Sequence, residues 1–209
     1  NGRRGALMIS LDVRHPDVLE FIKMKQDLTK VTGANVSVRI TDDFMNAVMN
    51  DEDYELHFPV GDPTPQFAHV VKAREVWQEI VEAATKTAEP GILMWDNITK
   101  NLPAESYSAQ GFKTLTTNPC GEIPLSAYDS CRLISVNLKN FVKERWTESA
   151  YFDLEEFSEV ARKAMRLSDD LVELEIEKLE AILKVADTPD ERALWKQLLE
   201  ACVKGRRTG

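Results

Sequence analysis

Several features that would assign this sequence to a common class of protein are missing from it. No apolar run is long enough to cross a membrane, and no signal-peptide pattern is found in the first residues. The 26 Lys and Arg residues are outnumbered by 35 Asp and Glu residues. The resulting net charge of -9 argues against nucleic-acid binding, which needs a basic surface. We therefore expect neither a membrane nor a nucleic acid as a partner.

Cysteine is also scarce, with only Cys120, Cys131 and Cys202. An odd number in a chain of 209 residues does not make a secreted disulfide framework, so we expect a reducing, cytoplasmic setting. No Cys-x-x-Cys and no histidine pair lies near the first two, so no metal site is predicted. Cys202, beside apolar neighbours at helical spacing, is interpreted as a small core residue. By composition alone, Cys120 and Cys131 would be buried structural thiols as well.

Both ends of the chain are unusual. It starts at Asn1–Ala6 without Met and runs straight into an apolar stretch, and it stops at Lys204–Gly209 directly after a helical pattern. We expect a piece of a longer chain, with a mature processed product as the alternative.

The pattern that is present indicates a soluble globular protein of the α/β class. The chain is 43% hydrophobic and 29% charged, which allows a sizeable core. Predicted strands are 6–13, 36–40, 54–60, 92–95 and 132–138, and predicted helices follow His15, span 44–49 and 66–87, begin after Asp153 and begin again at Thr188. Residues 97–111 are predicted as a loop. This alternation of strand and helix favours mostly parallel strands, and the final third is helical. The charges between 175 and 185 are interpreted as a solvated helix face.

One stretch, Thr116–Pro124, carries the most chemistry. It places a carboxamide, a thiol and a carboxylate on alternate positions, at Asn118, Cys120 and Glu122. In an extended chain, alternate residues point to one face, so these three groups would converge. The two prolines of the stretch exclude a helix, and its glycine permits a sharp bend.

The pairing of thiol and carboxylate in this stretch is awkward for ordinary nucleophilic catalysis. A carboxylate such as Glu122 raises the pKa of a neighbouring thiol, whereas a thiolate nucleophile needs a lowered pKa. We therefore favour a route by hydrogen-atom chemistry for Cys120.

The segment Asn118–Leu125 resembles the finger-loop motif of the ribonucleotide reductase catalytic chain, and it is most similar to the adenosylcobalamin-dependent class. The eleven-position step from Cys120 to Cys131 fits the same class. Further similar segments are 5–6, 15–22, 35–38, 41–45, 89–92 and 205–209. The resemblance implies a ten-stranded α/β barrel with a central finger loop. We expect residues 1–142 to form part of this barrel and 143–209 to form a mainly helical continuation.

The family's roles carry over to matching positions. Cys120 would be the thiyl radical that takes the 3′-hydrogen of the ribose, Glu122 the general base on the 3′-hydroxyl, and Asn118 a hydrogen-bonding partner of the ribose hydroxyls. Cys131 would be one of two thiols that reduce the 2′-position and become a disulfide, which a thioredoxin-like reductant resets. Adenosylcobalamin would supply the radical, with contacts mostly outside this chain.

The chain departs from a whole enzyme of this family in one respect. No cysteine precedes Cys120, although the redox pair needs a second, upstream cysteine. We therefore expect the chain alone to be inactive, and the effector site to lie in missing segments. Arg3 and Arg4 lie where the specificity loop would be and are candidate substrate-binding residues, although these and Arg206 and Arg207 are equally compatible with solvated charges.

Four questions stay open at this point. The substrate is a ribonucleoside diphosphate or triphosphate, and a dimeric parent enzyme is possible. The alternative within the family is an oxygen-dependent class with a separate radical-generating subunit, which Pro119 and Gly121 count against. The alternative from another class is a non-catalytic nucleotide-binding or assembly fragment.

Overall fold

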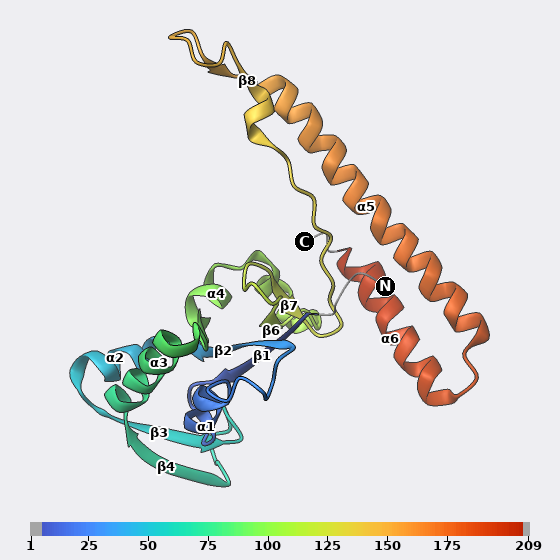
Figure 1. The fold of residues 1–209 in the computed structure, drawn as a ribbon. Coiled ribbons are helices and arrows are strands. Elements are labelled where there is room, and N and C mark those ends of the chain that lie inside the picture. Colours follow the sequence, from blue (N-terminus) through green and yellow to red (C-terminus); the bar gives the residue numbers. More distant parts are fainter. Residues whose placement is uncertain (1–5, 207–209) are drawn as a thin grey trace. The chain divides into compact units, whose positions relative to one another are not determined.

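A computed structural model describes residues 6–206 of the chain. It divides into two compact units, Asn1–Ser126 and Ala127–Gly209. Each unit has its own secondary structure and is described by itself (Figure 1).

The first unit is built on a small parallel sheet. Its strands are β1 (Leu7–Asp12), β2 (Ala34–Ile40) and β5 (Gly91–Met94), in the order β1-β2-β5 (Figure 1). Helix α1 (Val18–Lys23) leads from β1 to β2, and α2 (Asp42–Asn50) and α3 (Ala73–Thr87) lie between β2 and β5 in the chain. This alternation confirms the α/β prediction for the central sheet.

The core of the first unit lies between one face of this sheet and the helices. Alternate residues of β2, including Val38 and Ile40, are fully buried against apolar side chains of the helices. The fully buried members of this cluster are Val13, Val18, Ile22, Val38, Ile40, Phe44, Leu56, Ala73, Val76, Ile80 and Ala83. Burial of these side chains is the main driving force for folding of the unit.

An antiparallel pair of strands precedes α3. Strands β3 (Asp53–Phe58) and β4 (Phe67–Lys72) pair from Asp53 opposite Lys72 to Phe58 opposite Phe67. The helix predicted over 66–87 is therefore wrong in its first part, and only Ala73–Thr87 is helical. The apolar residues of β4 fit both helical and strand spacing, and the hydrogen bonds offered by β3 decide for the strand.

The segment predicted as a turn and loop after β5 is also different. Helix α4 (Trp95–Asn101) and a 3₁₀ segment, η1 (Pro103–Gln110), occupy it. Side chains satisfy this helix locally: the Thr99 hydroxyl donates to the carbonyl of Trp95 at 3.0 Å, and the Asn101 amide donates to that of Asn97 at 2.8 Å. The polar composition therefore marks a short, partly exposed helix rather than a loop.

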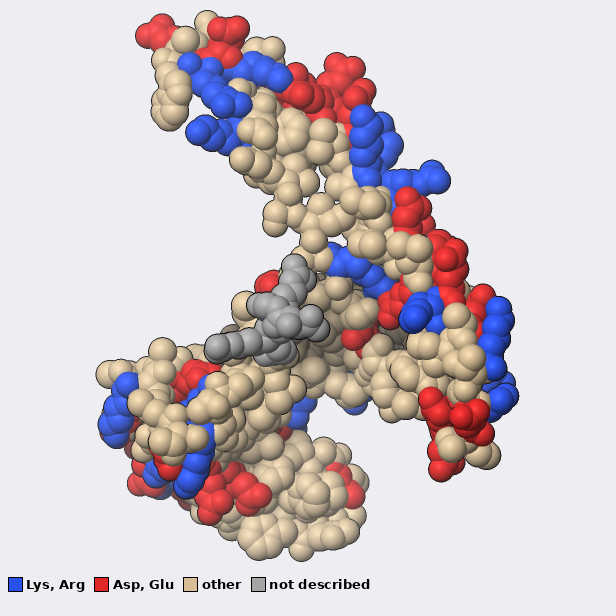
Figure 2. Space-filling view, turned by 45° about the vertical axis from the view of Figure 1, so that its right-hand side comes forward, with Lys and Arg blue, Asp and Glu red and all other residues tan. Residues whose placement is uncertain are grey.

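The second unit contains two long helices. Helix α5 (Leu154–Val185) and helix α6 (Pro189–Gly205) pack against each other. Both predicted caps are confirmed: the carboxylate of Asp153 accepts from the backbone N–H of Glu156 at 2.9 Å, and the hydroxyl of Thr188 accepts from that of Glu191 at 3.2 Å. Acidic and basic side chains are interspersed along the long helix (Figure 2).

The rest of the second unit has little regular structure. A 3₁₀ turn, η2 (Leu138–Phe141), leads into the short strands β8 (Val142–Lys143) and β9 (Tyr151–Phe152), which form an antiparallel pair. The strand predicted over 132–138 is wrong, because no strand within 6–206 pairs with these residues. Leu133 is 72% exposed, and no neighbouring strand among the described residues offers this segment the backbone hydrogen bonds of a sheet.

The whole is a mixed α/β structure, and the described residues form no closed barrel. Six of the nine strands belong to antiparallel pairs, so the expectation of mostly parallel strands holds only for the central sheet. Within residues 6–206 no helix is long and apolar enough to cross a membrane.

Candidate functional site

The finger-loop motif with Asn118, Cys120 and Glu122 lies in a hairpin of the first unit. Strands β6 (Thr114–Thr117) and β7 (Pro124–Ser126) are antiparallel, with Thr117 opposite Pro124. Residues 118–123 connect them, so Asn118, Cys120 and Glu122 share one loop. The expectation of an extended chain with all three on one face is wrong, because the chain reverses direction between Asn118 and Ile123.

Hydrogen bonds close this loop on itself. The backbone N–H of Asn118 donates to the carbonyl of Ile123 at 3.1 Å, and the N–H of Ile123 donates to the side-chain Oδ1 of Asn118 at 2.9 Å. The N–H of Gly121 donates to the carbonyl of Asn118 at 2.9 Å. Asn118 therefore closes the loop with both its backbone and its side chain, which gives it a structural task in addition to any contact with a ligand.

Gly121 supplies the backbone conformation that the loop needs. Its φ of +85° lies in the region that favours glycine. A Cβ at this position would lie 3.5 Å from Cδ2 of Leu93, an ordinary contact, so the requirement for glycine comes from the backbone angle rather than from lack of space.

Cys120 and Glu122 are exposed in the loop, whereas Asn118 is half-buried. The interpretation of Cys120 as a buried structural thiol is therefore wrong. Cys120 forms no disulfide. An exposed thiol and an exposed carboxylate two positions apart are both open to a bound molecule.

Polar side chains of the central sheet hold this hairpin. The Ser10 hydroxyl of β1 hydrogen bonds to that of Thr116 at 3.3 Å. Two side chains of β2 donate to backbone carbonyls of the hairpin, Nδ2 of Asn35 to Pro119 at 3.1 Å and Nη1 of Arg39 to Leu115 at 3.2 Å. Asn35 and Arg39 alternate with the buried Val38 and Ile40, so the hairpin lies on the face of the sheet opposite the helices.

Charge on this face is balanced by one buried carboxylate. Asp12 receives two hydrogen bonds from the guanidinium of Arg14 at 2.9 Å. Burial raises the pKa of Asp12, but its hydrogen bonds with Arg14 and the charges of Arg14 and Arg39 outweigh this effect and hold the pKa below its usual value. Burial lowers the pKa of Arg39, whose guanidinium also lies 4.9 Å from the ring centre of Trp95. Asp12 therefore stays ionised and offsets the positive charge at the base of the hairpin.

Sequence reasoning missed Ser10, Asn35 and Arg39 as contacts of the motif. A signal was available, because Asn35, Ser37 and Arg39 alternate with apolar residues along β2. This polar face is tightly packed around Ser37. A Cβ atom added to Gly91 in the neighbouring strand would lie 2.8 Å from the Ser37 hydroxyl oxygen. The pattern marks a polar face, but nothing in it indicates what the face contacts.

Cys131 lies in the second unit and is half-buried. It belongs to the irregular segment before η2. The residues on both sides of it contact one carboxylate of α5: the Ser130 hydroxyl donates to Oε2 of Glu175 at 3.5 Å, and the Arg132 guanidinium forms an ion pair with the same atom. Glu175 therefore anchors the backbone that carries Cys131.

The other predicted residues are placed as follows. Arg3 and Arg4 lie outside the described residues, as does Arg207. Arg206 pairs with Asp169 at 2.8 Å and with Glu173 at 2.5 Å, so it holds the end of α6 against α5 rather than being merely solvated. Cys202 is half-buried on α6, and burial raises the pKa of its thiol.

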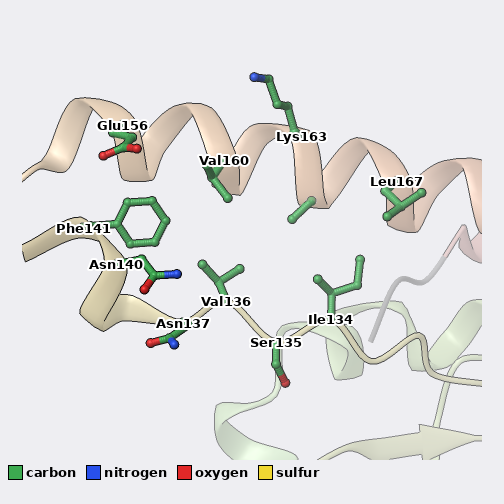
Figure 3. Close-up of a pocket in the computed structure, with 11 residues that line it drawn as sticks. Ile134, Ser135, Val136, Asn137, Asn140, Phe141, Glu156, Val160, Lys163 and Leu167 are labelled. Atoms are coloured by element: carbon green, nitrogen blue, oxygen red, sulfur yellow. The ribbon is translucent and has the colours of Figure 1, made fainter.

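A groove of about 600 Å³ lies in the second unit, between residues 134–141 and helix α5. Figure 3 shows Ile134, Val136 and Phe141 facing Val160 and Leu167 across it, with Lys163 directed away. The groove is mainly apolar and contains no cysteine, so it is not part of the chemistry predicted from the sequence.

Comparison with known proteins gives the family. The sequence profile of the family "Ribonucleotide reductase, barrel domain" matches residues 1–192. A vitamin B12-dependent ribonucleoside-diphosphate reductase of Thermoplasma acidophilum is 37% identical over 184 residues, which is 88% of this chain and 22% of the relative. A protein of the same name from Mycobacterium tuberculosis is 34% identical over 173 residues, covering 82% of this chain and 23% of the relative.

A third relative comes from a virus. The putative ribonucleoside-diphosphate reductase large subunit of Frog virus 3 is 35% identical over 156 residues, covering 70% of this chain and 26% of the relative. The chain thus spans about a quarter or less of the length of these relatives. The match to the family profile confirms the resemblance found in the finger-loop motif, and the chain belongs to the ribonucleotide reductase barrel-domain family.

Proposed function

We propose that this chain is part of an enzyme that reduces ribonucleotides to deoxyribonucleotides by thiyl-radical chemistry. The observation that carries the proposal is the exposed thiol of Cys120 in a closed hairpin loop that also presents Glu122 and Asn118. The names of the relatives support ribonucleoside diphosphates as substrates, so we favour diphosphates over triphosphates.

Adenosylcobalamin is the cofactor we propose, because relatives from Thermoplasma and Mycobacterium are named vitamin B12-dependent. Among the described residues, the Cys120 thiol suits this cofactor, because it is exposed and forms no disulfide. The cofactor supplies a radical when bound, since no side chain of the described loop generates one. We propose that most of its contacts lie in polypeptide beyond these residues.

Each residue of the loop then has a separate task. Cys120 loses its hydrogen atom and, as a thiyl radical, takes the 3′-hydrogen of the ribose. Glu122 accepts the proton of the 3′-hydroxyl, for which an exposed carboxylate near the thiol is suitable. Asn118 holds the ribose hydroxyls. Because Cys120 reacts as a radical, it needs no thiolate, and a neighbouring carboxylate does not hinder it.

Reduction of the 2′-position needs two thiols, and we assign one of them to Cys131. The two thiols give up two electrons and two protons as they form a disulfide, which a thioredoxin-like dithiol reduces again. No cysteine precedes Cys120 in the chain, so the second thiol comes from other polypeptide. We therefore propose that these 209 residues do not turn over alone.

The wider setting follows from the same proposal. Residues 1–142 would contribute to a ten-stranded barrel and 143–209 to its helical continuation, with Arg3 and Arg4 near the substrate. The effector nucleotide would bind to other segments, the reductase would act in the cytoplasm for DNA synthesis, and a dimer is compatible with this organisation. An oxygen-dependent enzyme with a separate radical-generating subunit is less favoured, given the vitamin B12-dependent relatives.

The test is a comparison of Cys120→Ser with Cys202→Ser in a reductase that carries this sequence. Cys120→Ser should abolish deoxynucleotide formation and leave nucleotide binding largely intact, because the substitution removes only the hydrogen-transferring sulfur. Cys202→Ser, at a half-buried thiol of α6, should keep most of the activity. Turnover is measured as deoxynucleotide formed, and binding by equilibrium dialysis.

Normal activity of Cys120→Ser would overturn the radical assignment. Nucleotide affinity that is unchanged in Glu122→Gln and Asn118→Ala, together with no turnover under any condition, would favour a non-catalytic nucleotide-binding role.

A further inference from the structure

A side chain of the central sheet bonds directly to the backbone of the Cys120 loop. Ser10 and Arg39 of the sheet contact the strand β6, at Thr116 and Leu115. Asn35 reaches the loop itself, where its Nδ2 donates to the carbonyl of Pro119 at 3.1 Å. Pro119 is the residue directly before Cys120.

The thiol has little else to fix its position. Cys120 is exposed, and its side chain takes part in no disulfide. Its place is therefore set by the backbone around it. On one side, the bond from the N–H of Gly121 to the carbonyl of Asn118 closes the turn. On the other side, the ring of Pro119 fixes one backbone angle, and Asn35 holds the carbonyl.

The chemistry of Asn35 suits this contact. The carbonyl of Pro119 needs a donor, and a carboxamide offers N–H groups at neutral charge. Asn35 sits on β2 opposite Met8 of β1, and strand β2 is hydrogen bonded on both sides, by β1 and by β5. The donor is thus carried by the middle strand of the central sheet, at a position that pairs with β1 and precedes the residues paired with β5.

We propose that Asn35 is a positioning residue for Cys120: by holding the Pro119 carbonyl it fixes the place from which the thiol acts. The catalytic part of this inference rests on the proposed function, whereas the restraint on the loop does not. Asn35 touches neither the thiol nor any reacting atom, so it acts only through the loop.

The first test measures the restraint in the 209-residue chain by amide hydrogen exchange of Gly121 and Ile123, whose N–H groups close the loop. Asn35→Asp keeps the shape of the side chain and removes its donor, and Asn35→Ala removes both. The matched control is Asn101→Ala, which deletes an amide-to-carbonyl bond of 2.8 Å in α4, away from the hairpin contacts.

Both Asn35 variants should exchange at Gly121 and Ile123 about fivefold faster, which corresponds to the loss of one hydrogen bond. Asn101→Ala should leave these rates unchanged. The amide of Thr147, which donates to Glu144 in the turn between β8 and β9, is the reference within each molecule and should not change. Rates that rise equally at all three amides would indicate general destabilisation and would overturn the proposal, as would unchanged rates.

The second test uses a reductase that carries this sequence. Asn35→Asp and Asn35→Ala should lower kcat by about tenfold and leave KM for the nucleotide within about twofold, because displacing a reacting group slows chemistry more than binding. Faster exchange with unchanged kcat would overturn the positioning role. The proposed function fails separately, through an active Cys120→Ser, so the two failures are distinguishable.

Discussion

The backbones around the two predicted catalytic cysteines are organised differently. Cys120 lies in a hairpin loop whose ends are joined by hydrogen bonds between Asn118 and Ile123. Cys131 lies in a segment without regular secondary structure, held by contacts of its neighbours with Glu175 of helix α5. The first is therefore shaped mainly by residues close in sequence, and the second by residues about forty positions away.

This difference shows what each segment needs in order to be ordered. A hairpin loop supplies its own hydrogen-bonding partners and then adds contacts with a sheet already formed by β1, β2 and β5. An extended segment instead depends on another strand, on side chains or on water to satisfy its backbone groups. Within residues 6–206, Cys131 has the side-chain anchor and no strand.

The largest expected effect comes from a substitution in the core of the first unit, which supports the sheet that the hairpin contacts. Phe44 is fully buried in the core of the first unit, with its ring centre 5.1 Å from that of Tyr54. Phe44→Ala should lower the free energy of unfolding by about 3–5 kcal/mol, because it leaves a cavity. Leu133→Ala, at a side chain that is 72% exposed in the second unit, should change it by less than about 0.5 kcal/mol. Urea denaturation measures both.

Similar losses for these two variants would contradict the comparison. They would mean that the segment around Leu133 is packed in solution, and sedimentation of the protein at several concentrations would then show whether a second copy covers it.

A smaller effect sharpens the description of the hairpin as locally shaped. Gly121→Ala should lower the free energy of unfolding by about 1–2 kcal/mol, because an L-residue at its positive φ of +85° is strained. Gly33→Ala is the control, since a Cβ there meets nothing within 4 Å and its φ lies outside the left-handed region. It should be neutral or slightly stabilising in the same urea titration. Equal stability of the two variants would show that the loop does not keep this conformation.

The smallest effect concerns the anchor of Cys131. Glu175→Gln removes the charge that pairs with Arg132, and its side chain is 39% exposed, so the loss should be about 0.2–1 kcal/mol. Cys131 should then be alkylated up to about fivefold faster, as measured by mass spectrometry of the labelled peptides. Glu177→Gln, at an exposed glutamate of the same helix, is the control and should not alter the rate. If both variants react alike, the anchor does not restrain Cys131.

Local signals in the sequence were sufficient for much of the fold. The caps at Asp153 and Thr188 predicted the starts of α5 and α6, because a side-chain oxygen three residues before a backbone N–H is a local arrangement. The apolar runs of β1 and β2 predicted their strands for the same reason. Non-local pairing was not accessible: Phe67–Lys72 is a strand because β3 lies beside it, and no pattern within those residues states this.

For the candidate site, the sequence pointed to residues whose roles stay predictions, and it did not indicate how the chain folds around them. The resemblance identified Asn118, Cys120 and Glu122, whereas alternation along an extended chain predicted the wrong arrangement. The reversal depends on a side chain, that of Asn118, bonding to an N–H five residues later. The contact from Asn35 joins residues 84 positions apart, and such a contact follows from the folded sheet rather than from either segment.

The bond between Asn118 and Ile123 has a consequence for how the loop recognises a sugar. A backbone N–H only donates, so the Asn118 atom that faces it is the oxygen, and this bond leaves the amide N–H groups available to a ligand. Under the proposed function, Asn118 donates a hydrogen bond to a ribose oxygen through its amide nitrogen, while its own oxygen already accepts the bond from Ile123. The hydrogen of that same hydroxyl is then directed elsewhere, and Glu122 is the acceptor that the loop provides. The orientation of the Asn118 amide thus leaves Glu122 to accept the proton of the hydroxyl that Asn118 holds.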